Sequence, residues 1–201
     1  MWSPNLTRSI PEMSDAQLEK LLREGVHPTR KELWVMPSHL FQHLSKIDMA
    51  SLILHLRSLP VVGEKSPPPV LGPKAMAEIA NGSVKPEAAL VSENRSVMPF
   101  DAGKRFAQGR YIASLTCAEC HGVKLKGNNV PAEFPIPDLA VASAMSAKEF
   151  DHFITTGELP DGRKINELMV GVAKSRFSKL TKDERRNLYD YLVARATQAQ
   201  P

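Results

Sequence analysis

Apolar residues in the second half of the chain recur every three or four positions, which predicts amphipathic helices. Three segments carry this pattern: Gly103 to Leu115, Ser146 to Thr156, and Thr181 to about Ala196. The second and third open on Ser or Thr with Glu three residues later, a capping box that marks a helix start. Gly157 ends the second, as glycine commonly does. We therefore predict an all-α domain in this half.

The first half repeats the later part of this pattern. Residues 14–25 open on a serine and end on a glycine, as residues 146–157 do, and Met36 follows them much as Met169 follows Gly157. Further matching pairs are Phe41 with Phe177, Leu44 with Leu180, Leu52 with Leu188, and Leu56 with Leu192. An internal repeat of this length predicts two related units.

Prolines separate the two units. They lie in Ser66-Pro67-Pro68-Pro69 and in Gly72-Pro73, and such a segment favours a stiff, extended linker. One short helix is expected after them, from Lys74 to Ala80. The predicted organisation is a first unit over residues 1–62, a linker over 63–97 and a second unit over 98–201.

The residues with distinctive chemistry are Cys117-Ala118-Glu119-Cys120-His121, which contain both cysteines of the chain. Cys-x-x-Cys-His is the attachment signature of c-type haem. Cysteines one helical turn apart can both reach the vinyl groups on one edge of a porphyrin, and the adjacent His121 then lies under the iron as its proximal ligand. The motif thus predicts a covalently attached haem.

Two other uses of Cys-x-x-Cys fit the chain less well. A thioredoxin-like redox pair is expected near a βαβ pattern, which this chain lacks. A structural zinc site needs a fourth ligand, commonly from a second Cys/His pair, and the nearest downstream histidine, His152, stands alone. Haem attachment is therefore the favoured interpretation.

Three downstream residues are candidates for a sixth iron ligand. Met145 directly precedes a capping box and is more typical of an apolar residue at a helix start. His152 falls inside the predicted helix, where a solvated or packed histidine is the usual case. Met169 lies in a segment, Ile165 to Ser175, that we expect to be irregular, and a loop there can bring a thioether over the haem. We favour Met169, with an ordinary core methionine as the competing interpretation.

With these features together, residues 98–201 resemble a class I cytochrome c domain. Gly109, eight residues before Cys117, matches the small residue at which the first and last helices of that family cross. Leu188 and Tyr191 match the contact positions on the last helix. The resemblance implies a class I cytochrome c-like helical fold around haem.

The resemblance also implies how the histidine is held. Pro137-Asp138-Leu139 is similar to the family's proline segment, whose carbonyl accepts the proximal histidine's N–H and fixes its tautomer. Pro135 is a nearby alternative. The implied cofactor-binding residues are Cys117, Cys120, His121, Pro137, Leu139 and Met169, with His121 and Met169 as the axial ligands of the iron.

The first unit is incomplete by this measure. In the second unit the cysteines precede the repeated helix by roughly thirty residues, but only about a dozen residues precede Ser14. The first unit therefore lacks a Cys-x-x-Cys-His motif, and Met36 is expected to be a structural methionine. We expect one haem c per chain, and we expect the chain to be the C-terminal part of a longer dihaem protein.

Composition narrows the functional classes. The formal net charge is +4, and no lysine/arginine stripe marks a nucleic-acid surface. No apolar span of about twenty residues predicts a transmembrane segment, and no signal peptide is apparent, as expected of a fragment. Haem of the c type implies a periplasmic location.

The resemblance implies electron transfer, not catalysis. It points to the dihaem cytochrome subunits that accept electrons from a bacterial dehydrogenase subunit and pass them to an acceptor of the respiratory chain. One alternative is a haem enzyme or sensor with an open distal site, as in a peroxidase. Another is an interaction module whose first unit is degenerate.

Overall fold

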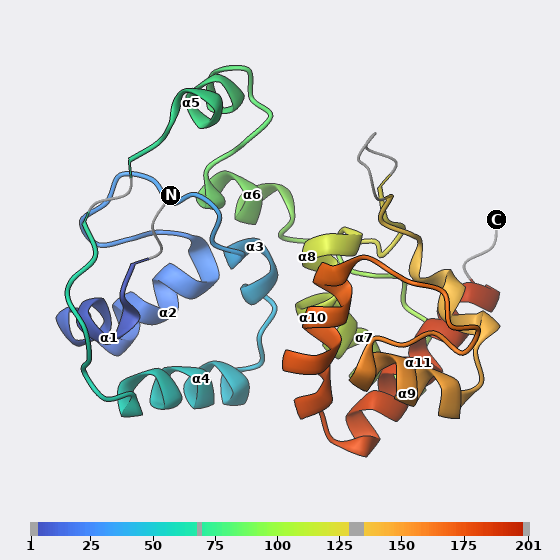
Figure 1. Ribbon diagram of the computed structural model, residues 1–201. Helices are drawn as coiled ribbons and strands as arrows, with labels where there is room; N and C mark the ends of the chain where they lie inside the picture. Colours follow the sequence, from blue (N-terminus) through green and yellow to red (C-terminus); the bar gives the residue numbers. More distant parts are fainter. Residues whose placement is uncertain (1–3, 68–69, 129–134, 199–201) are drawn as a thin grey trace. The chain divides into compact units, whose positions relative to one another are not determined.

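The computed structural model describes residues 4–67, 70–128 and 135–198, so Pro68 and Pro69 of the expected linker lie outside the described residues. The chain divides into two compact units, with the boundary between Ser96 and Val97. Within the described ranges the regular elements are helices joined by loops (Figure 1). One isolated antiparallel bridge pairs Asn128 with Ile136. The predicted all-α class is confirmed.

The second unit contains the three predicted helices and several that were not predicted. Its elements are η2 (Lys104–Phe106), α7 (Ala107–Thr116), α8 (Ala118–His121), η3 (Leu139–Ala144), α9 (Ala147–Thr156), α10 (Glu167–Ser175), η4 (Phe177–Lys179) and α11 (Lys182–Gln198). Both capping boxes are present, at Ser146 and at Thr181. Gly157 ends α9 in the left-handed conformation, at φ 77°.

The prediction of an irregular segment from Ile165 to Ser175 was wrong. This segment is mostly α10, and Met169 lies in the helix's first turn. The side chain of Asn166 caps the helix by accepting the Leu168 N–H at 2.8 Å. Gly171, in the middle of the segment, weakens the sequence signal because glycine lowers helix propensity.

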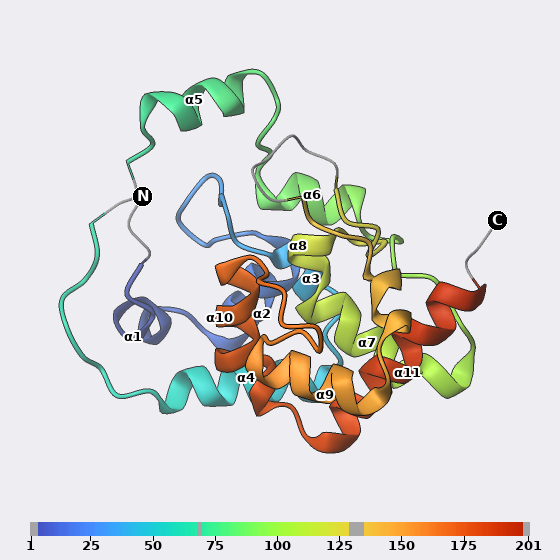
Figure 2. The ribbon, with the colours of Figure 1, turned by 45° about the vertical axis from the view of Figure 1, so that its right-hand side comes forward.

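Helices α7 and α11 cross closely in the second unit, and Figure 2 shows them side by side as Figure 1 does. Leu188 and Tyr191 on α11 are fully buried. A Cβ atom added at Gly109 would lie 2.6 Å from the Cβ of Tyr191 and would also strike the backbone of Asn187. The predicted crossing at Gly109 is therefore confirmed, because only glycine leaves room for it.

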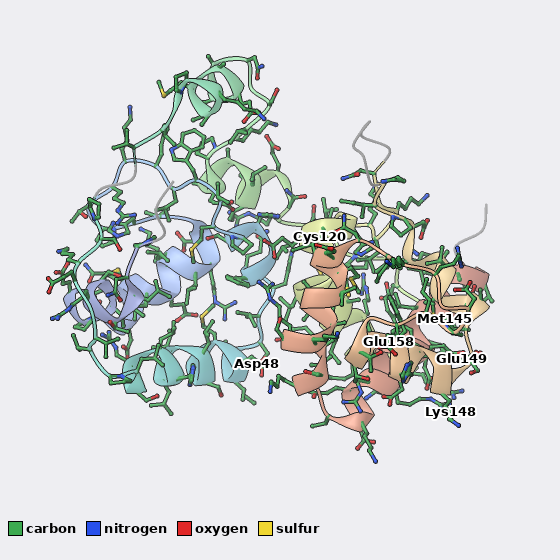
Figure 3. The ribbon with its side chains drawn as sticks, viewed as in Figure 1. Asp48, Cys120, Met145, Lys148, Glu149 and Glu158 are labelled. Carbon is green, nitrogen blue, oxygen red and sulfur yellow. The ribbon has the colours of Figure 1, made fainter. Side chains whose placement is uncertain are left out.

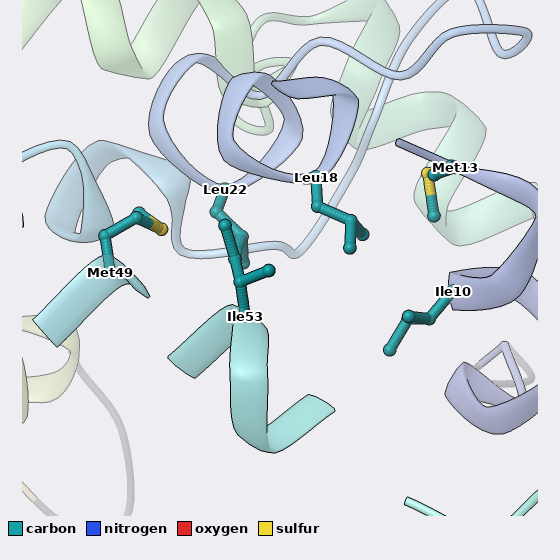
Figure 4. Packing of buried hydrophobic residues seen from close by; sticks show 6 residues of the cluster. All are labelled: Ile10, Met13, Leu18, Leu22, Met49 and Ile53. Atoms are coloured by element: carbon teal, nitrogen blue, oxygen red, sulfur yellow. The ribbon is translucent and has the colours of Figure 1, made fainter. Parts of the chain in front are cut away.

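The first unit repeats part of this arrangement. Its elements are α1 (Leu6–Ser9), η1 (Ile10–Glu12), α2 (Asp15–Glu24), α3 (Ser38–Phe41), α4 (Lys46–Ser58), α5 (Pro73–Ala80) and α6 (Glu87–Glu93). Helix α2 opens on a capping box at Ser14 and ends on Gly25 at φ 66°, so it matches α9. The core of this unit is an apolar cluster of Ile10, Met13, Leu18, Leu22, Met49 and Ile53 (Figure 4). Met36 is half-buried and packs against this cluster.

The stretch expected to be a linker holds two helices. The first, α5, agrees with the helix expected from Lys74 to Ala80. The second, α6, packs on α2 and α3 and buries Glu87 and Val91. The Glu87 N–H donates to the carbonyl of Leu33 at 3.0 Å, and its carboxylate lies 3.1 Å from Nδ1 of His39. Residues around α6 are thus part of the first unit's packing.

Candidate functional site

The two cysteines lie on one turn of backbone at the junction of α7 and α8. Cys117 ends α7, with its N–H bonded to the carbonyl of Ala113 at 3.0 Å. The N–H of His121 bonds to the carbonyl of Cys117 at 2.9 Å, so α8 keeps helical spacing through the motif. Cys117 is buried, whereas Cys120, which is labelled in Figure 3, is exposed. Both thiols are free and are offered along one helical turn, as covalent attachment to one porphyrin edge requires.

The electrostatics of the cysteines differ from those of a redox or zinc site. Burial raises the pKa of the Cys117 thiol to about 11. Burial and the carboxylate of Glu119 raise the pKa of Cys120 as well, although Arg176 opposes them. Catalytic and metal-binding cysteines need the thiolate, and their surroundings usually lower the thiol pKa. The described residues also contain no group of three or more His, Cys, Asp or Glu side chains placed to hold a metal ion.

The ring of His121 is held in one orientation by a backbone carbonyl. Its Nδ1 lies 2.9 Å from the carbonyl oxygen of Pro137. A carbonyl only accepts hydrogen bonds, so Nδ1 carries the proton and Nε2 keeps its lone pair for a metal. Burial lowers the pKa of His121, partly opposed by the bond to Pro137 and by Asp138. The ring is therefore neutral near pH 7, as an iron ligand must be.

Two loops frame the histidine and are bonded to each other. After the motif, the Gly127 N–H donates to the carbonyl of His121 at 2.9 Å, while the Leu139 N–H donates to the carbonyl of Leu125 at 3.0 Å. Leu125 is fully buried in the left-handed region at φ 59°. At Gly127, also at positive φ, an added Cβ would lie 2.6 Å from the carbonyl carbon of Pro137. The close approach of these loops brings Pro137, not Pro135, to the histidine.

The distal candidates occupy three different settings. The carbonyl of Met145 accepts the hydroxyl of Tyr189 at 2.6 Å, which fixes the entry to α9. His152 is exposed on α9, with Nε2 3.3 Å from the carboxylate of Glu158. Met169 is half-buried in the first turn of α10, and one end of that helix lies near α8 in both Figure 1 and Figure 2. The hydrogen bonds described above connect the segments that carry Cys117, His121, Pro137 and Leu139. Met169 lies outside those segments, on α10.

Arg195 also belongs to this region, although it was not predicted from the sequence. Its side chain is buried on α11, where Nη1 donates to Oδ1 of Asp138 at 2.7 Å and Nη2 donates to the carbonyl of Lys124 at 3.0 Å. Burial alone would raise the pKa of Asp138, but the bonds from Arg195 and from the Ala140 N–H outweigh it and lower that pKa. The available signal was spacing, since Arg195 follows Tyr191 by four residues on the buried face of the helix.

The arrangement fits a covalently held haem. Two un-ionised thiols lie one turn apart, and a neutral imidazole presents a free Nε2 beside them. The other ring nitrogen, Nδ1, donates to a backbone carbonyl, which is a common partner of metal-bound histidines.

Comparison with known proteins agrees with this geometry. The family model described as cytochrome c matches residues 102–195, which include the motif, the proline segment and the crossing of α7 with α11. No curated protein matches the chain significantly. None of the described helices combines the length and apolar character needed to cross a membrane.

Proposed function

We propose that residues 102–195, which the cytochrome c family model matches, carry covalently bound haem c and transfer electrons, and that Cys117 and Cys120 attach the haem. In this proposal His121 is the proximal iron ligand and Met169 the distal one. The haem supplies a one-electron couple, and the protein supplies attachment, burial and ligand choice. Pro137 and Leu139 line the haem on the side of His121.

The observation that carries this proposal is the 2.9 Å contact from His121 Nδ1 to the Pro137 carbonyl. It fixes the tautomer and leaves Nε2 for iron within the same turn that bears both cysteines.

Met169 is proposed as the distal ligand because it lies in the first turn of α10, a helix with one end near α8. The backbone carbonyl of Met145 accepts the Tyr189 hydroxyl at the entry to α9, and Nε2 of His152 lies 3.3 Å from the carboxylate of Glu158. Thioether ligation favours ferrous iron and raises the potential, and a filled sixth position keeps substrates off the metal. Such a domain carries electrons and makes or breaks no bond in a substrate.

The exposed side of the attachment turn suits exchange of electrons with a partner. Cys120 is exposed there, and Arg176 lies near enough to influence its pKa. We propose a dehydrogenase subunit as donor and a respiratory-chain protein as acceptor, in the periplasm. A partner that presents carboxylates around its own cofactor would complement Arg176.

The first unit, in this proposal, is an incomplete cytochrome c-like unit without its own haem. Its α2, α3 and α4 follow the order of α9, α10 and α11, but its described residues contain no cysteine. Met36 packs against the apolar cluster as a structural residue. The second candidate role for this unit is that of a module that docks the partner of the haem domain.

Absorption spectra of the purified holoprotein test the proposed ligands. The expected result is one haem per chain and a low-spin ferrous spectrum that carbon monoxide leaves unchanged. Met169→Ala should open the iron to carbon monoxide, while Met145→Ala should not. A wild-type haem that is high-spin and binds carbon monoxide would overturn the carrier and support an open-site enzyme or sensor.

A further inference from the structure

We infer that Arg195 is a positioning residue for the proximal histidine: it clasps the two loops around His121 and so maintains the bond from His121 Nδ1 to the Pro137 carbonyl. The inference rests on the proposed role of His121 as an iron ligand. It assigns a function in the haem site to a residue of the last helix that does not contact the histidine through any described bond.

Arg195 is placed for this role by its burial and its two partners. Only 3% of the residue is exposed, yet its guanidinium makes one bond to Asp138 and one to the carbonyl of Lys124. These partners are on different loops, Lys124 shortly after the attachment motif and Asp138 in the proline segment. The planar guanidinium carries several N–H donors in a fixed fork, so it can hold both at once.

The bond from Arg195 to Asp138 restricts the carbonyl of Pro137, which accepts the hydrogen bond from His121. That carbonyl belongs to the peptide group joining Pro137 to Asp138, and a peptide group moves as a rigid plane. Oδ1 of Asp138 accepts from Arg195 at 2.7 Å and from the Ala140 N–H at 2.8 Å. Because two hydrogen bonds hold Oδ1 of Asp138, the orientation of the adjoining peptide plane is restricted.

The bond to Lys124 acts on the other loop, which begins at the histidine itself. Leu125 follows Lys124, and its carbonyl accepts the Leu139 N–H, which ties this loop to the proline segment. The Gly127 N–H returns to the carbonyl of His121. Arg195 therefore fixes the donor side and the acceptor side of the same contact relative to α11.

The consequence for iron lies in the strength of the bond at Nδ1. A hydrogen bond from the far ring nitrogen orients a ligating histidine and raises its basicity. Without the two bonds from Arg195, the Pro137 carbonyl could move away from His121, and the Nδ1 proton would exchange with water more often.

The experiment measures exchange of the His121 Nδ1 proton by NMR of ¹⁵N-labelled ferrous holoprotein. Arg195→Met keeps the apolar length of the side chain but removes both bonds, and exchange should become about tenfold faster, the size expected for loss of a typical hydrogen bond. Arg186→Met is the matched control, because Arg186 is an exposed arginine on the same helix that pairs with Asp190. Its exchange should stay at the wild-type rate.

Two milder variants keep the inference open to refutation if Arg195→Met does not fold. Arg195→Lys retains the charge but has one ammonium group for two loops, and Asp138→Asn retains an oxygen for the Ala140 N–H but removes the charge that Arg195 binds. Both should speed exchange several-fold. Wild-type exchange rates in both folded variants would show that Arg195 only stabilises the fold, and would overturn the inference.

This outcome is separable from that of the proposed function. If carbon monoxide binds the wild-type iron, the electron-carrier proposal fails, but the CO-bound ferrous protein is also low-spin and the Nδ1 proton can be followed in it. If no haem is attached through Cys117 and Cys120, the proposed function fails before the NMR experiment begins.

Discussion

The two units start and end their matching helices in the same way, but different segments pack over the glycine at the end. Each helix opens on a serine capping box and ends on a glycine at positive φ, Gly25 in α2 and Gly157 in α9. Over Gly157 lies Val170 of α10, the next helix along the chain, whose Cα would be 2.8 Å from an added Cβ. Over Gly25 lies Glu87 of α6, whose Cβ would be 2.8 Å away.

This difference shows that a repeated sequence specifies local structure more firmly than packing partners. Capping boxes and left-handed glycines act within a few residues, so both copies have them. The surface that such a helix presents can be covered by whichever apolar segment is available. In the second unit this is α10, which carries Met169, and in the first it is a segment some sixty residues further on.

The largest effect should come from removing the haem attachment. A Cys117→Ser, Cys120→Ser double variant should carry no covalent haem and should lose the cooperative unfolding of the second unit, because the apolar surface around a haem loses its partner. The first unit, with its own apolar cluster, should keep its helices. Haem staining after denaturing electrophoresis, and denaturant unfolding followed by circular dichroism, would measure both. Parallel loss of the two units would contradict their independence.

A smaller effect is expected at the crossing of α7 and α11. Gly109→Ala should lower the free energy of unfolding of the second unit by about 3 kcal/mol, because the new methyl group meets Tyr191 and the backbone of Asn187. Gly171→Ala is the matched control, since a Cβ there meets nothing within 4 Å. It should raise stability by up to about 1 kcal/mol through helix propensity. Equal effects of the two changes would contradict a close crossing.

The packing of α6 can be tested in the first unit alone. Val91 is 4% exposed, and Val91→Ala should cost about 1–2 kcal/mol by removing buried methyl groups. Met76 on α5 is 54% exposed, so Met76→Ala should change stability by less than about 0.5 kcal/mol. Denaturant midpoints of the first unfolding transition give both values. A neutral Val91→Ala would mean that α6 does not stabilise the first unit.

The smallest effect concerns pH in the first unit. Burial lowers the pKa of His43 from 6.5, partly opposed by a bond to the backbone of Asn94, with His39 lowering it further. As pH falls below about 6.5 the unfolded state takes up this proton first, so stability falls with pH until the folded-state pKa is passed.

Comparison of two variants isolates that contribution. His43→Gln should reduce the loss of stability between about pH 7 and pH 5, while His55→Gln, on the exposed side of α4, should leave it unchanged. An identical loss in the His43→Gln protein would show that other groups dominate this pH range.

Much of the candidate haem site could be predicted because its signals are local. Cys117, Cys120 and His121 lie within one turn, so their spacing alone states the chemistry. Gly109 and Tyr191 are far apart in sequence, but the resemblance to class I cytochromes c brought them together, and the structure confirms their contact. Helix starts at Ser14, Ser146 and Thr181 followed from capping boxes.

The remainder depended on contacts between distant segments. Helix α10 was missed because Gly171 weakens its propensity, whereas its cap at Asn166 and its packing against α9 stabilise it. Arg195 would ordinarily be assigned to the solvent, since arginines are rarely buried unless paired. Its partners Asp138 and Lys124 lie 57 and 71 residues away.

By itself the sequence determined that the chain has two helical units and that the second bears both cysteines and a histidine on one turn, because capping, periodicity and a five-residue motif all act over short distances. Only the tertiary structure decided that α6 covers the first unit and that a buried arginine joins the two loops around His121. Those outcomes depend on which surfaces meet after the chain folds back, and no short stretch of residues encodes that choice.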